Sequence, residues 1–220
     1  LVFSSSALIF ATALMISVLI ITSSMQNQIR KEVDKYGANI VVTPSTNSLQ
    51  VPYGTLSLGS NTIQESLIEN IFTIKNRGNI RVVSPKLYGQ VVYDNSTVLI
   101  AGIIPKNESN LKVWWSITGS LPQNEANEVM LGAEVENVLK RDVGSTLTIK
   151  GVVLRVVSIL GATGSVDDYT LFVPLHLAQR LLGQPGVVSV IDVGALCDAC
   201  PVEEISRQIK GVIPGVQATP

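Results

Sequence analysis

Hydrophobic residues follow one another almost without interruption at the start of the chain. From Leu1 to Thr22 the only polar side chains are those of Ser and Thr, and the first charged residue is Arg30. A helix needs about 20 mostly apolar residues to cross a bilayer. The pattern therefore predicts a transmembrane helix over 1–24 with a truncated N-terminus. The next segment has no Gly or Pro before Gly37, so we expect a helical stalk over 25–36.

Two other interpretations of the apolar start stay open. Ala11-Thr12-Ala13 has the small-x-small form of a cleavage site, so the segment could be a signal peptide, or it could be a helix buried in a soluble core. Against a signal peptide, this site falls inside the apolar run and no basic segment precedes it. The transmembrane helix is the favoured interpretation.

The pattern changes after the stalk to short strands and one helix. Residues 38–43 are predicted to form a short strand, and a long polar loop over 44–61 follows it. Thr62 and Glu65 have the spacing of a capping box, which predicts a helix that ends before Gly78. Further strands are expected at 80–83, 87–93 and 98–104.

The second half of the domain begins with a break in this pattern, which predicts a loop over 105–123. The elements expected after it are a strand at 129–131, a helix at 133–140, strands at 146–150, 152–160 and 171–173, a helix between Pro174 and Gly183, a strand at 187–193 and a helix at 201–210. We therefore expect an α+β fold over 37–220, with 37–104 and 160–220 forming an α/β lobe and 105–159 an inserted β-rich lobe.

Composition excludes some functions. The 220 residues carry a net charge of −1 without a basic excess, which argues against nucleic acid as a partner. Two Cys and one His leave little material for an internal metal site. We expect no catalytic, cofactor-binding or metal-binding residues, and His176 is interpreted as solvated or capping. The adjacent Asp167 and Asp168 are interpreted as turn formers and not as cation ligands.

Two residue pairs are candidate functional residues. Cys197 and Cys200 form a C-x-x-C motif just before a helix, which suits a local disulfide, a redox pair, half of a metal site shared with a second chain, or two free thiols. Trp114 and Trp115 suit either packing in the core or in a lobe, or contact with a partner or the membrane surface.

Several segments together resemble one family, the MacB-like periplasmic core domain of ABC transporter permeases, which also includes FtsX-like and lipoprotein-releasing permeases. The segments that carry this resemblance are Val129 to Glu134 with Val143 to Ile149, Ala101 to Pro105, Trp114 to Pro122, Thr163 to Asp168, and Phe172 to Leu175. Their order and spacing cover about residues 1 to 218.

The resemblance implies a two-lobed extracytoplasmic domain at the cell membrane, with the α/β lobe near the membrane and the β-rich lobe further out. It also implies a dimer of permease copies, an ABC ATPase that binds ATP on a separate subunit or domain, and an extracytoplasmic partner protein or substrate. The family's remaining three membrane helices are absent, so this chain is expected to be a fragment. It also has no phosphate-binding loop for ATP. The alternative is a single-pass anchored binding or thiol-redox protein that uses Cys197 and Cys200.

Overall fold

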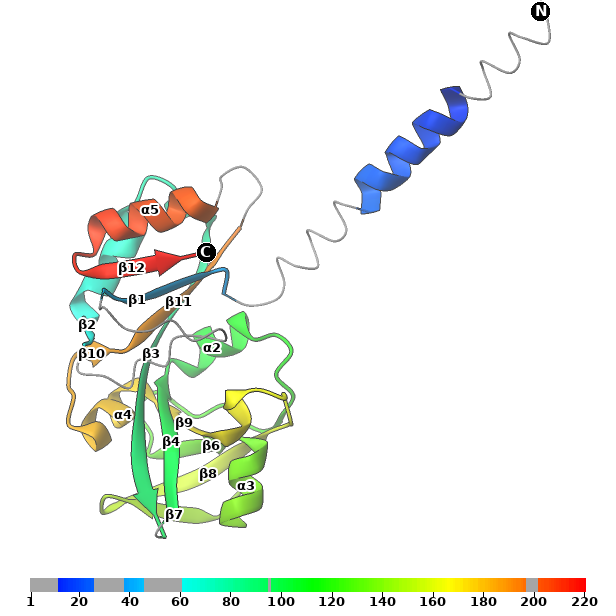
Figure 1. Cartoon of the computed structure of the whole chain (residues 1–220). Helices are drawn as coiled ribbons and strands as arrows, with labels where there is room; N and C mark the ends of the chain where they lie inside the picture. Colours follow the sequence, from blue (N-terminus) through cyan, green and yellow to red (C-terminus); the bar gives the residue numbers. More distant parts are fainter. Residues whose placement is uncertain (1–11, 26–37, 46–60, 95, 197–201) are drawn as a thin grey trace, which may run out of the picture. The chain divides into compact units, whose positions relative to one another are not determined.

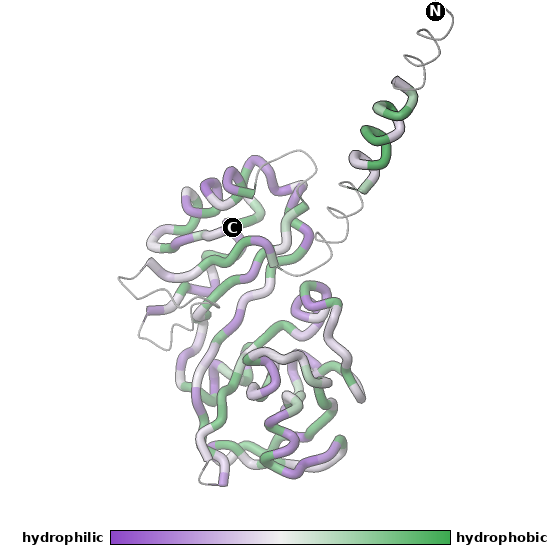
Figure 2. Tube along the Cα trace, turned by 45° about the vertical axis from the view of Figure 1, so that its right-hand side comes forward, coloured by the Kyte–Doolittle hydropathy of each residue, from purple (hydrophilic) through white to green (hydrophobic). Residues whose placement is uncertain are grey.

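The structure is a computed structural model that describes residues 12–25, 38–45, 61–94, 96–196 and 202–220. It divides into two units, 1–36 and 37–220. In the first unit, residues 12–25 form an α-helix whose large apolar residues are more than half exposed. Figure 2 colours the apolar positions of this helix green. Among the described residues, no helix is long and apolar enough to be a candidate membrane span. The transmembrane helix over 1–24 and the stalk over 25–36 extend beyond the described residues and stay predictions.

The second unit has both helices and strands throughout, which confirms the predicted α+β class (Figure 1). Its strands are β1 (Ile40–Pro44), β2 (Ile63–Gln64), β3 (Ile80–Tyr93), β4 (Ser96–Ile103), β5 (Ile117–Gly119), β6 (Glu128–Leu131), β7 (Thr146–Ile149), β8 (Val152–Leu160), β9 (Thr170–Pro174), β10 (Val187–Val188), β11 (Val190–Ala195) and β12 (Val216–Thr219). Its α-helices are α2 (Pro105–Leu111), α3 (Ala133–Leu139), α4 (Leu175–Leu182) and α5 (Val202–Val212), and its 3₁₀ helices are η1 (Glu65–Thr73), η2 (Arg77–Asn79) and η3 (Val166–Tyr169).

One mixed sheet runs through the unit in the order β12-β1-β11-β3-β4-β9-β6-β8-β5, with β7 paired to β8. Strand β3 is its longest strand and changes partner along its length: Ile80 to Lys86 pair with β11, and Leu87 to Tyr93 pair with β4. We call the described residues within 38–86 and 187–220 the terminal lobe and the described residues within 87–182 the central lobe. Strand β3 passes from one lobe to the other (Figure 1).

The single strand β3 corrects the prediction of two strands at 80–83 and 87–93. Pro85 lies between the two predicted segments, and proline has no N–H to donate to a strand ladder. In the structure the part of β3 before Leu87 pairs with β11 on one side only, and Pro85 lies opposite Ile191. A strand with one open side tolerates proline, so β3 continues without a break.

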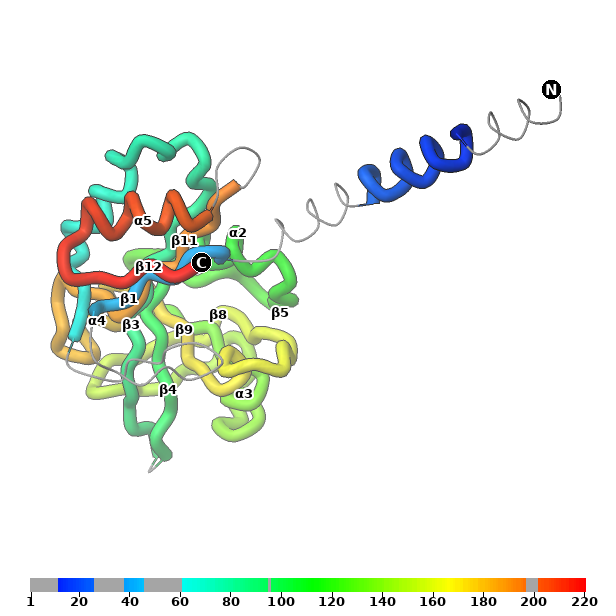
Figure 3. Tube along the Cα trace, turned by 45° about the horizontal axis from the view of Figure 1, so that its top comes forward, coloured from blue at the N-terminus to red at the C-terminus, as the bar shows by residue number. Residues whose placement is uncertain are grey.

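The terminal lobe packs helices on antiparallel strands. Strands β12, β1, β11 and the first half of β3 are all antiparallel neighbours, and α5 packs against β12 and η1 (Figure 3). Strand β12 was not predicted. The helix predicted after Thr62 is a 3₁₀ helix that begins at Glu65, and Gln64 at its N-cap makes no side-chain cap. The capping box is therefore wrong, and the Glu65 carboxylate instead accepts a hydrogen bond from Gln179.

The central lobe buries both faces of its part of the sheet. Alternating residues of β9 point to opposite faces: Leu171 and Val173 join one apolar cluster, and Phe172 joins another. Helix α4 packs very closely on β3 and β4, because a Cβ atom at Gly102 would lie 2.3 Å from the Ala178 Cβ and one at Gly89 would lie 2.5 Å from the Leu182 side chain. These glycines allow the close contact.

The division into an α/β lobe of 37–104 and 160–220 and an inserted lobe of 105–159 stays a prediction, and in the structure Leu171 and Val173 of β9 pack with Leu131 of β6. One prediction about the middle of the chain needs correction. The segment 105–123 was predicted as a loop, but it contains α2 and β5. Pro105 occupies the first turn of α2, where a missing N–H costs nothing, so it begins a helix and does not only end the preceding strand.

Candidate functional site

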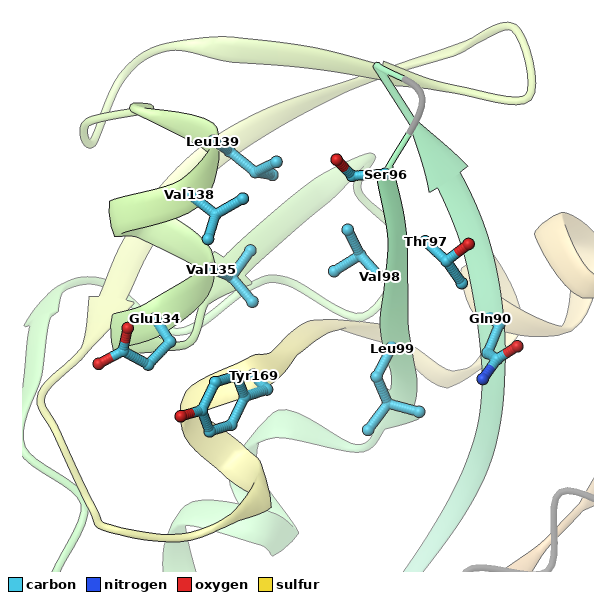
Figure 4. A pocket seen from close by; sticks show the side chains of 10 residues that line it. All are labelled: Gln90, Ser96, Thr97, Val98, Leu99, Glu134, Val135, Val138, Leu139 and Tyr169. Atoms are coloured by element: carbon cyan, nitrogen blue, oxygen red, sulfur yellow. The ribbon is translucent and has the colours of Figure 1, made fainter.

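A cleft of about 320 Å³ lies in the central lobe between α3 and β4 (Figure 4). Val98 of β4 and Val135, Val138 and Leu139 of α3 point into the space between the two elements. Its complete lining is Gln90, Ser96, Thr97, Val98, Leu99, Glu134, Val135, Val138, Leu139 and Tyr169. This volume is at the lower end of the range for ligand-binding pockets.

The apolar wall of the cleft follows from helical spacing on α3. Val135 and Leu139 are four residues apart and Val138 lies three after Val135, so all three share one side of the helix. Val135 is buried in the core of the central lobe, whereas Val138 is 65% exposed. Helix α3 therefore packs into the core through Val135 and exposes Val138 at the cleft.

The polar groups of the cleft give it a negative charge. Glu134 and Tyr169 line the end where α3 meets η3 (Figure 4). The lining contains no basic side chain, and within the described part of the chain no ion pair involves Glu134. The Tyr169 side chain is also accessible, since the residue is 62% exposed. Together they can accept a cationic group beside an apolar one.

The edge of β4 is open along the cleft. Strand β9 pairs with β4 only from Leu99 onward, where Leu99 lies opposite Thr170. Within the described ranges, no strand pairs with Ser96 to Val98 on the side away from β3. An unpaired strand edge beside apolar side chains is a surface to which an extended polypeptide can add.

A second site is a row of five alternating charges at the junction of the lobes, which we call the ion chain: Asp192, Lys86, Glu108, Lys112 and Asp167. Lys86 Nζ lies 2.5 Å from Asp192 Oδ2 and 2.7 Å from Glu108 Oε1. The Lys86 and Glu108 side chains are 3% and 0% exposed. Glu108 Oε2 also accepts a hydrogen bond of 2.7 Å from Ser84.

Lys112 continues the ion chain from α2 to η3. It lies one helical turn after Glu108, with its Nζ 3.1 Å from Glu108 Oε1 and 2.6 Å from Asp167 Oδ2. Trp115 Nε1 donates a hydrogen bond of 3.0 Å to the same Asp167 oxygen, and Lys112 Nζ lies 4.7 Å from the centre of the Trp115 ring. That ring packs on Phe172 with centroids 5.0 Å apart. The ion chain therefore ends against the core of the central lobe.

The neighbouring charges favour the ionised forms of Lys86 and Glu108. Burial lowers the pKa of Lys86, but the Glu108 and Asp192 carboxylates outweigh burial and hold that pKa well above its ordinary value. Burial raises the pKa of Glu108, and the Lys86 and Lys112 ammonium groups outweigh it, so that its pKa is lowered. Burial raises the pKa of the neighbouring Tyr88 phenol. Lys86 and Glu108 therefore stay charged at neutral pH.

The structure places the two predicted tryptophans differently. Trp115 is 9% exposed and is held by Asp167 and Phe172, so its role is packing inside the central lobe. Trp114 is 45% exposed and stays a candidate partner contact. The candidate pair Cys197 and Cys200 lies outside the described residues, as does most of the predicted loop 44–61.

The other candidates have local structural roles. The His176 ring lies 3.1 Å from Gln179 Oε1 on the exposed side of α4. Asp168 forms a turn, as predicted, because its carboxylate accepts hydrogen bonds from the Thr163 hydroxyl and the backbone N–H of Gly164. Asp167 differs from the prediction because it belongs to the ion chain. Among the described residues, no group of three or more His, Cys, Asp or Glu could hold a metal ion.

Sequence reasoning missed both the cleft and the ion chain. A lysine inside an apolar strand, as at Lys86, signals a buried partner, because an unpaired buried charge is very unfavourable. Glu108 and Lys112 are four residues apart, which is the spacing of an ion pair on a helix. The sequence predicts a loop for this segment, so that spacing gave no signal. Glu134 could not be identified from the sequence as a cleft residue, because the cleft forms only where α3 packs beside β4 in the tertiary structure.

Solved structures of two transporter domains share this fold. The periplasmic region of MacB from Actinobacillus actinomycetemcomitans matches with a TM-score of 0.61 and 14% sequence identity, over 85% of this chain and 91% of that one. The extracellular domain of the noncanonic ABC-type transporter YknZ from Gram-positive bacteria matches with a TM-score of 0.57 and 13% identity, over 83% and 99%. No curated protein is significantly similar in sequence. The model of one protein family matches residues 2–211. This chain, with its cleft and its ion chain, therefore belongs to the MacB-like periplasmic core domain family.

Proposed function

We propose that this chain is the extracytoplasmic part of a permease subunit in an ATP-driven ABC transporter or mechanotransmission complex. The observation that carries this proposal is the family match over 2–211, supported by the fold shared with MacB and YknZ domains. In this role the domain is not an enzyme: ATP is bound and hydrolysed by a partner ABC ATPase, and a second permease copy completes a dimer at the membrane.

The cleft between α3 and β4 is the surface by which the domain contacts its partner. An extended segment of an extracytoplasmic protein would add to the open edge of β4 at Ser96 to Val98 and place an apolar side chain against Val138. A basic side chain of the same segment would pair with Glu134, which supplies the only charge in the cleft lining. The open strand edge favours a polypeptide over a small molecule as the occupant.

The proposed subunit role is tested by purifying the complete gene product from its native membrane with a mild detergent. We expect an ABC ATPase to co-purify in equal amount, with two permease copies per complex by mass. A complex that hydrolyses ATP, and loses this activity when the ATPase phosphate-binding lysine is replaced, would support the assignment. A purified protein without any ATPase subunit or ATPase domain would overturn it.

A further inference from the structure

The ion chain crosses the junction between the two lobes. Its first member, Asp192, lies on β11 of the terminal lobe, and its last member, Asp167, lies in η3 of the central lobe. Lys86 stands at the point where β3 changes partner, because it is the last residue paired with β11 and Leu87 is the first paired with β4. The charges therefore cluster where the sheet passes from one lobe to the other.

Helix α2 carries the two middle contacts of this crossing. It follows β4 of the central lobe along the chain, but it docks on the part of β3 that belongs to the terminal lobe. Asn107 Nδ2 donates to the Val83 carbonyl at 2.8 Å, and Arg81 Nη2 donates to the Asn110 carbonyl at 2.6 Å. Helix α2 is thus a brace between the lobes, and Glu108 is its buried centre.

The lobes also touch at α4, where the contacts are of another kind. Leu175 of α4 packs into the apolar cluster of the terminal lobe, and Gln179 Nε2 donates to Glu65 at 2.7 Å. Apolar contacts have no preferred direction. Gln179 is only 4% exposed and also donates to the Val187 carbonyl at 3.1 Å. These contacts hold the lobes together as well, but none of them pairs two buried charges.

We propose that the ion chain is a clamp that sets the angle between the terminal and central lobes. A different angle would separate Lys86 of the terminal lobe from Glu108 of the central lobe and leave both charges buried without their shared contact, which is strongly unfavourable. One arrangement satisfies all five charges, so the clamp selects it. Because the cleft is in the central lobe, the clamp also fixes the direction that the cleft faces relative to the terminal lobe. This inference goes beyond the proposed function and does not depend on it.

The clamp is tested by measuring the distance between the lobes in the full chain with pulsed electron spin resonance. Spin labels are attached to Lys210→Cys on α5 and Asn137→Cys on α3, two exposed positions, after both native cysteines are replaced by Ser. We expect one narrow distance distribution. In Glu108→Gln we expect a distribution at least twice as wide, or a second distance.

A matched control distinguishes an effect on the angle between the lobes from a general loss of stability. Glu128→Gln removes a carboxylate of similarly low exposure that pairs with Arg155 inside the central lobe, and it should leave the distance distribution unchanged. Ser84→Ala removes the hydrogen bond from Ser84 of the terminal lobe to Glu108 of the central lobe. It is a milder variant in case Glu108→Gln does not fold, and it should also widen the distribution. A folded Glu108→Gln or Ser84→Ala protein with the original narrow distribution would overturn the proposal.

Discussion

Lys86 of β3 and Asp192 of β11 are diagonal neighbours across the two strands, with Nζ 2.5 Å from Oδ2. Asp192 lies opposite Ser84, two residues before Lys86, so all three side chains leave the same face of the sheet. That face is covered by α2, which brings the Glu108 carboxylate to both Lys86 and Ser84. The sheet register therefore determines which charges meet at the junction of the lobes.

Removing the central charge of the ion chain should strongly destabilise the domain. In Glu108→Gln, the ammonium groups of Lys86 and Lys112 lose their shared buried carboxylate, and breaking a buried pair in this way costs about 3–5 kcal/mol. Chemical denaturation measures the free energy of unfolding. Arg207→Gln is the control, because its exposed ion pair with Glu204 should contribute less than about 1 kcal/mol. Equal losses of unfolding free energy in Glu108→Gln and Arg207→Gln would show that burial of the ion pair does not decide its contribution to stability.

The free energy of unfolding should fall at acidic pH because Glu108 becomes protonated. The pKa of Glu108 is lower in the folded protein than its ordinary value of 4.5, so the unfolded state binds more protons at acidic pH. Its contribution to stability is complete above about pH 4.5 and is lost as the pH falls through the folded pKa. The free energy of unfolding, measured between pH 7 and pH 3, should fall less steeply in Glu108→Gln. If the unfolding free energy of Glu108→Gln fell as steeply with pH as that of the original protein, the assignment of this effect to Glu108 would be contradicted.

Because α4 packs closely on the sheet, replacing Gly102 by a larger residue should lower the stability of the domain. In Gly102→Ala the new methyl group would meet the Ala178 Cβ at 2.3 Å, and such overpacking costs about 1–3 kcal/mol. Gly78→Ala is the control, because a Cβ there meets nothing within 4 Å. Thermal unfolding compares the two. The packing described for α4 would be wrong if Gly102→Ala were as stable as Gly78→Ala.

The cysteine prediction rests on the sequence alone. If Cys197 and Cys200 form a local disulfide in an oxidising compartment, the denatured protein from that compartment should contain no free thiol, and two after reduction, since the chain has two cysteines. Titration with a thiol reagent before and after reduction measures this. Two thiols without reductant would leave a free or metal-binding pair, and full function in Cys200→Ser would remove the redox alternative.

Local patterns in the sequence predicted much of the central lobe. The helix expected at 133–140 is α3, and the strands expected at 146–150 and 152–160 are β7 and β8, because helical and alternating periods are clear there. Gly183 ends α4 in the left-handed conformation that favours glycine, as expected from its place after the helix. These features depend on residues that are near each other in the chain.

The missed features depend on residues that are far apart. The buried position of Glu108 is explained by Lys86 and Ser84, which lie on another element. The place of β9 in the sheet has a similar cause: it pairs with β4 and β6, and no local pattern shows which strands are neighbours. The cleft follows from this arrangement and could not be predicted before it.

The proposed contact surface is tested most directly by photocrosslinking in cells that make the complete permease. A photoreactive phenylalanine analogue at position 138, in the cleft, is compared with one at position 153, another exposed valine of the central lobe. We predict one protein-sized adduct at position 138, lost when Glu134 is replaced by Arg, and none at position 153. Equal adducts at both positions, or an adduct at 138 that Glu134→Arg leaves unchanged, would contradict the account.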